Sequence, residues 1–184
     1  TESDEEAETL EIYLRDRVMN TKMSLSYTIF ENLPVIIRNT RFVHEGESSI
    51  VLERAMSLNL DLPDDRYEMV ELTGAWARER YVKTAPLHEG IQAIYSMRGH
   101  SSHQFNPFFA LKRPETTEDA GEAIGISLIY SGNFLGQTAV DTFGVARAMI
   151  GIHPEGFSWT LKKGETFQTP EAVLVYSGEG LGKM

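Results

Sequence analysis

The stretch RGHSSHQFNPFFAL, residues 98–111, holds residue types that could do chemistry. Two histidines, His100 and His103, flank a pair of serines, and Asn106 follows shortly after them. A histidine beside a hydroxyl is how a serine nucleophile is activated, and His-x-x-His is also a spacing used by metal ligands. The stretch therefore raises two hypotheses, a hydrolytic serine and a metal site.

Simple geometry weakens both hypotheses. On a strand, His100 and Ser102 would share one face and His103 would lie on the other, so the two histidines would point apart. In a loop, which Gly99 permits, the side chains can converge, but a triad also needs an orienting carboxylate that the sequence does not place. The simpler interpretation is a polar loop that satisfies backbone groups and leads into a buried strand at 108–111. We therefore assign no catalytic residue here.

Metal ligation has little support elsewhere in the chain. The five histidines are dispersed, and only His100 and His103 lie close together. The segment DLPDD offers the carboxylates of Asp61, Asp64 and Asp65, which are hard oxygen ligands, but it lacks the glycine and terminal glutamate of an EF-hand. A solvated acidic turn explains it more simply. We predict no metal site and no cofactor.

The two tryptophans differ in their surroundings. Trp159 shares its strand phase with Leu161, which favours a place in the core. Trp76 shares its phase with Arg78, on a face that is polar for so large a ring. An indole beside fixed charges can stack on a sugar while the charges bind its hydroxyls, or it can anchor a protein interface. The candidates for carbohydrate or domain-interface residues are Trp76, Arg78, His103 and Asn106.

Composition excludes several classes of function. The chain of 184 residues has no cysteine and a net charge of −10, with its lysines and arginines scattered. Nucleic acids and anionic membranes would be repelled, so we expect neither as a partner. No apolar run approaches the roughly 20 residues of a membrane helix. The lack of cysteine fits a reducing compartment, and we expect a cytoplasmic, bacterial location.

A period of two dominates the hydrophobic pattern. Residues 10–16 alternate apolar and polar side chains, residues 22–30 do the same, and residues 15–20 between them suit a hairpin connection. Further strands are predicted at 35–43, 48–62, 67–82, 91–97, 108–113, 123–134, 138–143, 145–152, 157–163 and 165–177. About a dozen strands, with turn residues between them, indicate a large antiparallel β-sandwich with few or no helices. We expect the loop at 112–123 to cross between the two sheets.

Several unusual segments resemble one known family. They run in colinear order and are LDLPDD (60–65), LTGAWARER (72–80), SSHQFNPFFAL (101–111), RPETTEDAGEAIGISLIYSGNF (113–134) and FQTPEAVLVYS (167–177). Together they resemble bacterial α-galactosidases of glycoside hydrolase family 36. One departure is His153 in GIHPEGFSW, where the family more often has asparagine.

The resemblance implies a particular architecture and chemistry. Family members have an N-terminal β-supersandwich like that of galactose-mutarotase-like proteins, a central (β/α)8 barrel and a small C-terminal β domain. They hydrolyse terminal α-galactosides, such as melibiose or raffinose, with retention, using two aspartates on barrel strands. Those aspartates lie in contexts like Lys-Trp-Asp-x-Asn and Ser-Gly-Gly-x-Arg-x-Asp, which do not occur in this sequence. No catalytic residue therefore carries over to this chain.

The resemblance also suggests how the chain is organised and what it binds. Residues 1–177 would be part of the N-terminal sandwich, and residues 178–184 would begin a linker toward the barrel. The chain opens without methionine and both ends look cut, so we expect a piece of a longer enzyme. Its expected partners are the catalytic barrel of the same polypeptide and further copies in a homo-oligomer, with α-galactosides as ligands of the parent.

Three hypotheses follow for function. The first is a non-catalytic sandwich that supports the barrel and the oligomer contacts of an α-galactosidase. The second is an independent carbohydrate-binding module that uses Trp76. The third is a self-sufficient hydrolase that uses the loop of His100 and His103.

Overall fold

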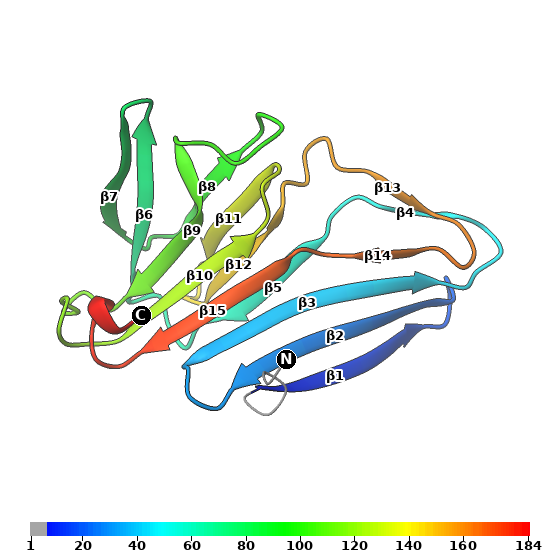
Figure 1. The fold of residues 1–184 in the computed structure, drawn as a ribbon, viewed down its shortest axis with the longest axis horizontal. Helices are drawn as coiled ribbons and strands as arrows, with labels where there is room; N and C mark the ends of the chain where they lie inside the picture. The colour runs from blue at the N-terminus through cyan, green and yellow to red at the C-terminus, as the bar shows by residue number, and fades with distance from the viewer. Residues whose placement is uncertain (1–6) are drawn as a thin grey trace.

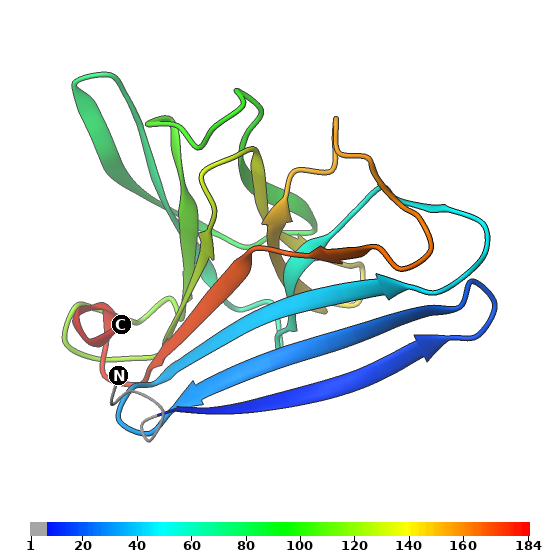
Figure 2. The same ribbon diagram turned by 45° about the vertical axis from the view of Figure 1, so that its right-hand side comes forward.

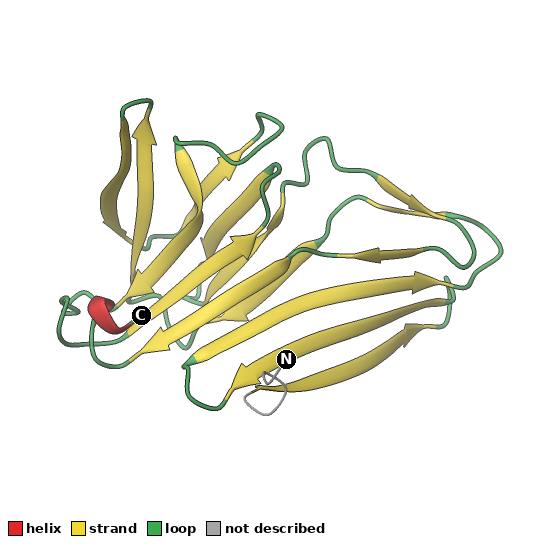
Figure 3. Ribbon diagram, viewed as in Figure 1, coloured by secondary structure: helices red, strands yellow, loops and turns green. Residues whose placement is uncertain are grey.

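The computed structural model describes residues 7–184, which form an all-β structure (Figure 3). One short 3₁₀ helix, η1 (Leu181–Lys183), accompanies the strands in this part of the chain. This confirms the predicted fold class. The strands are β1 (Ala7–Asp16), β2 (Thr21–Phe30), β3 (Val35–His44), β4 (Ile50–Leu52), β5 (Met56–Asp61), β6 (Glu68–Ala75), β7 (Arg78–Pro86), β8 (Gly90–Ser96), β9 (Phe105–Lys112), β10 (Ala123–Ile129), β11 (Phe134–Val140), β12 (Ala146–Ile152), β13 (Trp159–Leu161), β14 (Thr166–Gln168) and β15 (Glu171–Ser177).

These strands form two antiparallel sheets and a small flap (Figure 1). The large sheet has nine strands in the order β1-β2-β3-β15-β10-β9-β6-β7, with β14 also paired to β3. The small sheet has four strands in the order β5-β12-β11-β8. The flap is the pair β13–β4. The predicted sandwich is therefore present, with two sheets of unequal size.

The hydrophobic core lies between the small sheet and the middle of the large sheet. Alternation along each strand directs one set of side chains inward. In β10, for example, Ile126 and Leu128 are buried, whereas the Ser127 hydroxyl between them donates to the Pro107 carbonyl at 3.4 Å. Fully buried side chains from both sheets meet there, among them Phe109, Leu111, Ile126, Ile94, Phe134 and Ile150.

The first three strands continue beyond the small sheet as a long ribbon (Figure 2). The predicted hairpin at its start is confirmed, because β1 and β2 pair along their whole lengths. Asp16 closes the turn: its Oδ1 accepts hydrogen bonds from the amides of Val18 at 2.7 Å and Met19 at 3.2 Å. Asn20 takes a φ of 52°, a left-handed conformation that asparagine tolerates better than most residues.

Several expectations about the elements are wrong. Residues 48–62 form two strands in different sheets, because the chain turns between β4 and β5. Residues 67–82 form a hairpin of β6 and β7 rather than one strand. The loop at 112–123 joins β9 to β10, which are neighbours in the large sheet, so it does not cross between sheets.

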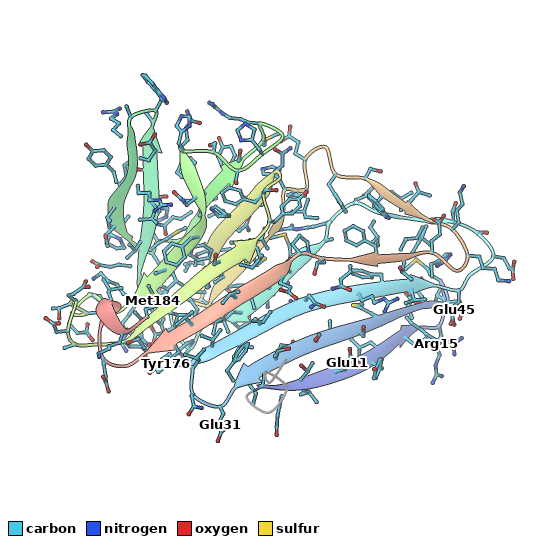
Figure 4. The ribbon with its side chains drawn as sticks, in the orientation of Figure 1. Glu11, Arg15, Glu31, Glu45, Tyr176 and Met184 are labelled. Carbon is cyan, nitrogen blue, oxygen red and sulfur yellow. The ribbon has the colours of Figure 1, made fainter. Side chains whose placement is uncertain are left out.

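The last residues of the chain fold back onto the large sheet. The amide of Gly180 donates to the Gly121 carbonyl at 2.8 Å, and the amide of Leu181 donates to the Thr117 carbonyl at 3.0 Å. Met184, labelled in Figure 4, lies against β10, where a Cβ on Gly125 would come within 2.8 Å of its sulfur. That residues 178–184 begin a linker stays a prediction. Between residues 7 and 184, no helix is long and apolar enough to cross a membrane.

Candidate functional site

The stretch at 98–111 forms the connection between β8 and β9, followed by β9 itself. His100 and His103 are both exposed. The contacts of this loop are mostly with backbone: His100 Nδ1 lies 2.6 Å from the Ser101 carbonyl, and the Ser96 hydroxyl donates to the His100 carbonyl at 2.6 Å. The Asn133 side chain accepts from the amide of Gly99 at 2.7 Å. These contacts support the interpretation of a polar loop.

Trp76 lies at the tip of the β6–β7 hairpin, where 84% of its surface is exposed. The chain reverses at Trp76 and Ala77, so the strand phase expected for Trp76 and Arg78 does not exist. Ala77 takes a φ of 64°, and its amide donates to Glu79 Oε1 at 2.9 Å, which holds the turn. Left-handed backbone costs an alanine about 1 kcal/mol, so the tip is under modest strain. The indole is thus a surface residue, and its role in binding carbohydrate or another domain stays a prediction.

A hollow of about 590 Å³ lies between this hairpin and the β8–β9 loop. Its walls are Thr73, Gly74, Arg78, Tyr81, Val82, Lys83, Gln104 and Phe105. Glycine is needed at one point, because a Cβ on Gly74 would lie 2.6 Å from the Arg78 carbonyl oxygen and 3.1 Å from that of His103. Gly74 thus lets the hairpin and the loop approach each other.

The side chains of the hollow are basic, hydroxylic and aromatic. Arg78 and Lys83 bring positive charge to a chain of net charge −10. Glu71, opposite Lys83 in the β6–β7 pair, is half-buried, and burial raises the pKa of its carboxyl while Lys83 lowers it. Tyr81, opposite Thr73, leaves 60% of its surface exposed. The hollow can therefore donate hydrogen bonds to a polar ligand and offer it an aromatic ring.

The four predicted carbohydrate or interface residues do not all lie at one site. Arg78 lines the hollow, whereas Trp76 lies at the hairpin tip and is not part of its wall. His103 approaches the hairpin through its backbone carbonyl. Asn106 is half-buried in β9, at a bulge where the pairing with β6 jumps from Phe109 to Phe105. The prediction did not include Tyr81, Lys83 and Gln104, which also line the hollow. These residues come together only through the strand register of the hairpin and the approach of the β8–β9 loop.

A second cluster of titratable side chains surrounds Arg113. Its Nη1 lies 2.6 Å from Asp64 Oδ1, and its Nε lies 3.2 Å from Glu122 Oε1. Its guanidinium carbon lies 3.9 Å from the centre of the Tyr67 ring, and the Tyr67 hydroxyl donates to Glu122 at 3.0 Å. The cluster joins the β5–β6 loop to the β9–β10 loop, so two of the segments that carry the family resemblance contact each other.

The pKa shifts of Asp64 and Tyr67 follow from the contacts of this cluster. The hydrogen bond from Arg113 lowers the pKa of Asp64, and the amide of Arg66 adds to that effect. Burial, together with the hydrogen bond to Glu122, raises the pKa of Tyr67 to about 12. Carboxylates neutralised by an arginine are poor proton donors near neutral pH, so these groups are suited to holding loops together.

The acidic turn at 61–65, predicted as an alternative to a metal site, forms ion pairs with two arginines. Asp64 binds Arg113, and Asp61 binds Arg147 with an Oδ1 to Nε distance of 2.5 Å. In the described range 7–184, no group of three or more histidine or acidic side chains has the geometry to hold a metal ion.

Trp159 differs from its prediction as a core residue. It lies in the flap with 48% of its surface exposed, and its ring packs 5.3 Å from that of Phe167 in β14. Leu161, two residues on, is buried as expected. The flap is too small to enclose an indole, so this ring covers the large sheet at its edge.

Comparison with known proteins places this geometry in a family. The model of the glycosyl hydrolase family 36 N-terminal domain matches residues 1–162. The α-galactosidase AgaA of Geobacillus stearothermophilus is 49% identical over 183 residues, covering 100% of this chain and 25% of that enzyme. Its crystal structure superimposes with a TM-score of 0.98 at 48% identity, again over 100% of this chain and 26% of the other. Mel36A of Lactobacillus acidophilus, also an α-galactosidase, is 42% identical over 184 residues, 100% of this chain and 25% of its own.

The chain thus spans about a quarter of the relatives it matches. The matched region includes the hairpin, the hollow and the Arg113 cluster. Both the family model and relatives with more than 40% identity agree. This chain belongs to the N-terminal domains of glycoside hydrolase family 36, the family of these α-galactosidases.

Proposed function

We propose that this chain is the non-catalytic N-terminal sandwich of an α-galactosidase, and that it supports the catalytic barrel and the oligomer contacts of its parent. The observation that carries the proposal is coverage: the chain matches only about a quarter of each relative, and its residues 1–162 match the N-terminal domain of the family. The parent would hydrolyse terminal α-galactosides. Structures of AgaA variants with stachyose and with raffinose support that substrate class.

The charged side chains also support a structural role. Asp64, Glu122 and Asp61 are paired with arginines. Lys112 pairs with Glu68 at 2.5 Å across neighbouring strands of the large sheet. Retaining hydrolysis needs two carboxyl groups about 5 Å apart, one free to attack and one free to hold a proton. Carboxylates that are paired with arginine or lysine are suited neither to nucleophilic attack nor to holding a proton. We also propose a cytoplasmic location in a bacterium, on the resemblance to bacterial α-galactosidases; the lack of cysteine is compatible with a reducing compartment.

The purified chain is expected to release no nitrophenol from a nitrophenyl α-galactoside. The reason is that the carboxylates of the reaction would lie in the barrel, outside these residues. The measurement is absorbance of released nitrophenol, with the chain expressed in a host that lacks its own α-galactosidase. Turnover that persists in that host and disappears in His103→Ala would contradict the proposal and support the hydrolase hypothesis for the β8–β9 loop.

A carbohydrate-binding role is a second candidate, favoured by the hollow beside the exposed Trp76. Arg78, Lys83 and Gln104 can donate hydrogen bonds to sugar hydroxyls there, and Tyr81 offers an exposed ring for stacking. In the parent, such a surface would hold an oligosaccharide away from the barrel.

Tryptophan fluorescence tests this second candidate, because the chain has two tryptophans in different places. We expect stachyose in the millimolar range to shift the emission of Trp159→Phe, which retains Trp76, in a saturable way. The matched variant Trp76→Phe, which retains Trp159, should not respond. If neither variant responds, or if only Trp76→Phe does, the hairpin is not a sugar-binding surface.

A further inference from the structure

The connection from β12 to β13 holds a histidine that acts as a hydrogen-bond acceptor (Figure 1). His153 directly follows β12, and its backbone amide donates to the Asn133 carbonyl at 3.0 Å. Its ring Nδ1 accepts a hydrogen bond from the backbone amide of Glu155 at 3.1 Å. A backbone amide can only donate, so Nδ1 carries no proton in this contact. The ring is therefore neutral, with its proton on Nε2.

This hydrogen bond begins a tight turn. The amide of Phe157 donates to the Pro154 carbonyl at 3.1 Å, and Gly156 takes a φ of 77°, a positive value that favours glycine. The contact between His153 and Glu155 spans two residues, like the side-chain contact of an aspartate or asparagine in an Asx turn. His153 thus takes the place of an Asx residue with a side chain that can be protonated in mild acid.

The end of the turn carries the aromatic contacts of the flap. The centre of the Phe157 ring lies 5.6 Å from that of Phe167 in β14, and the centre of the Trp159 ring lies 5.3 Å from it. The pairing of β13 with β4 is short, because β13 has three residues. The position of the flap therefore depends on the turn and on these three rings.

The surroundings of the His153 ring disfavour a positive charge. The side chain is half-buried, and the Tyr95 ring of β8 lies edge-on to it with ring centres 5.9 Å apart. Burial lowers the pKa of His153, whereas the Glu155 carboxylate, the charged group that acts on the ring within residues 7–184, opposes that shift. Protonation at Nδ1 would also point an N–H at the amide N–H of Glu155, so the 3.1 Å contact could not persist.

We propose that His153 is a pH-sensitive latch for the flap: when Nδ1 takes a proton from solvent, the Glu155 amide loses its acceptor and the turn releases Phe157 and Trp159 from Phe167. Losing one hydrogen bond of this kind shifts the equilibrium between the closed and the open turn by about threefold to tenfold. Every residue of the latch lies in the described part of the chain, so the device needs no contact with the remainder of a longer enzyme.

The direction of the pH dependence follows from the lowered pKa of His153 in the folded chain. The stabilisation from the neutral ring is fully present above about pH 6.5, the usual histidine value. It is lost as pH falls through the lower folded value, because the open turn binds the proton more readily than the closed one. The latch is therefore closed at neutral pH and opens in mild acid.

Fluorescence of Trp159 tests the latch in the Trp76→Phe chain, where it is the single tryptophan. As pH falls from about 8 to about 5, we expect the emission to shift to longer wavelength with a midpoint below about pH 6.5. His153→Asn in the same chain supplies an acceptor that does not titrate, and should abolish the shift. The matched control His88→Asn removes an exposed histidine before β8 and should leave the shift unchanged.

NMR of the same chain gives a measurement that does not depend on emission. The amide of Glu155 and the indole N–H of Trp159 should titrate with the same midpoint as the ring nitrogens of His153. Glu155→Gln removes the carboxylate that favours the protonated ring, so it should move that midpoint to lower pH. Circular dichroism checks that each variant keeps its fold, and His153→Asp, which also supplies an acceptor, replaces His153→Asn if that variant misfolds.

Three results would overturn the proposal. One is an emission that stays constant between about pH 8 and about pH 5. Another is a His153 ring that titrates while the Glu155 amide and the Trp159 indole do not respond, which would make the turn independent of the charge on the ring. The third is the same emission shift in His153→Asn, which would assign the transition to a different titrating group.

Discussion

Replacing Phe109 with alanine is expected to destabilise the chain by about 3–5 kcal/mol, the usual cost of removing a buried phenylalanine. Phe109 is fully buried in β9, where it faces the small sheet across the core. The ring lies close to Ile94 of β8 at the point where Gly136 of β11 leaves room for both. The cavity left by the substitution is therefore enclosed by two sheets and cannot collapse easily. For a domain of this size, we expect the unfolding temperature to fall by about 10 °C.

The matched control comes from the same stretch of sequence. His103→Ala removes an exposed side chain of the β8–β9 loop and should leave the unfolding temperature unchanged. Thermal unfolding followed by circular dichroism distinguishes the two variants directly. A loss of stability in His103→Ala equal to that in Phe109→Ala would mean that the loop, and not the strand, organises this region.

This contrast shows what could be predicted from residues 98–111. The apolar half was predicted correctly as a buried strand, because burial follows from hydrophobicity and alternation. The polar half suggested catalysis through residue types alone. Catalysis depends on the directions in which side chains point, and those are decided by residues such as Asn133 and Ser131, which hold the loop from another part of the chain.

The hairpin of Trp76 shows a different limit. Its sequence continues the alternating pattern through the turn and contains none of the usual turn residues at the reversal. Ala77 nevertheless takes a left-handed conformation, supported by its hydrogen bond to Glu79. Tertiary pairing of β6 with β9 and of β7 with β6 outweighs this local preference. The hollow could not be predicted for the same reason, since it exists only because the chain reverses there.

The Arg113 cluster was beyond sequence reasoning because its members are distant along the chain. Arg113 and Asp64 are 49 residues apart. In the sequence, each of them has the pattern of an exposed turn residue. The pairing of β6 with β9 brings the two loops together. Both segments contribute to the family resemblance, but the resemblance does not show that they are in contact.

Arg113→Met is expected to destabilise the chain by about 2 kcal/mol, which lowers the unfolding temperature by about 4–8 °C. The substitution keeps an unbranched apolar stem but removes the guanidinium, which leaves Asp64 and Glu122 without their cation. The cost is below the roughly 3–5 kcal/mol of breaking a fully buried pair, because Arg113 keeps 18% of its side-chain surface exposed. Arg147→Met is the matched control. It breaks the Arg147–Asp61 pair, whose side chains are 54% and 61% exposed, and should leave the unfolding temperature unchanged.

The pH dependence separates a loss of charge pairing from a loss of packing in Arg113→Met. Arg113 lowers the pKa of Asp64 in the folded chain. The stability from this shift is therefore present above the unfolded carboxyl pKa of about 4 and is lost as pH falls through the lower folded value. The stability difference between the unsubstituted chain and Arg113→Met should thus be constant from neutral pH to about pH 5 and shrink below about pH 4. Urea unfolding at a series of pH values measures that difference. A difference that stays constant down to the lowest pH would show that Arg113 acts through its packing on Tyr67, and that the charges of the cluster do not hold the two loops together.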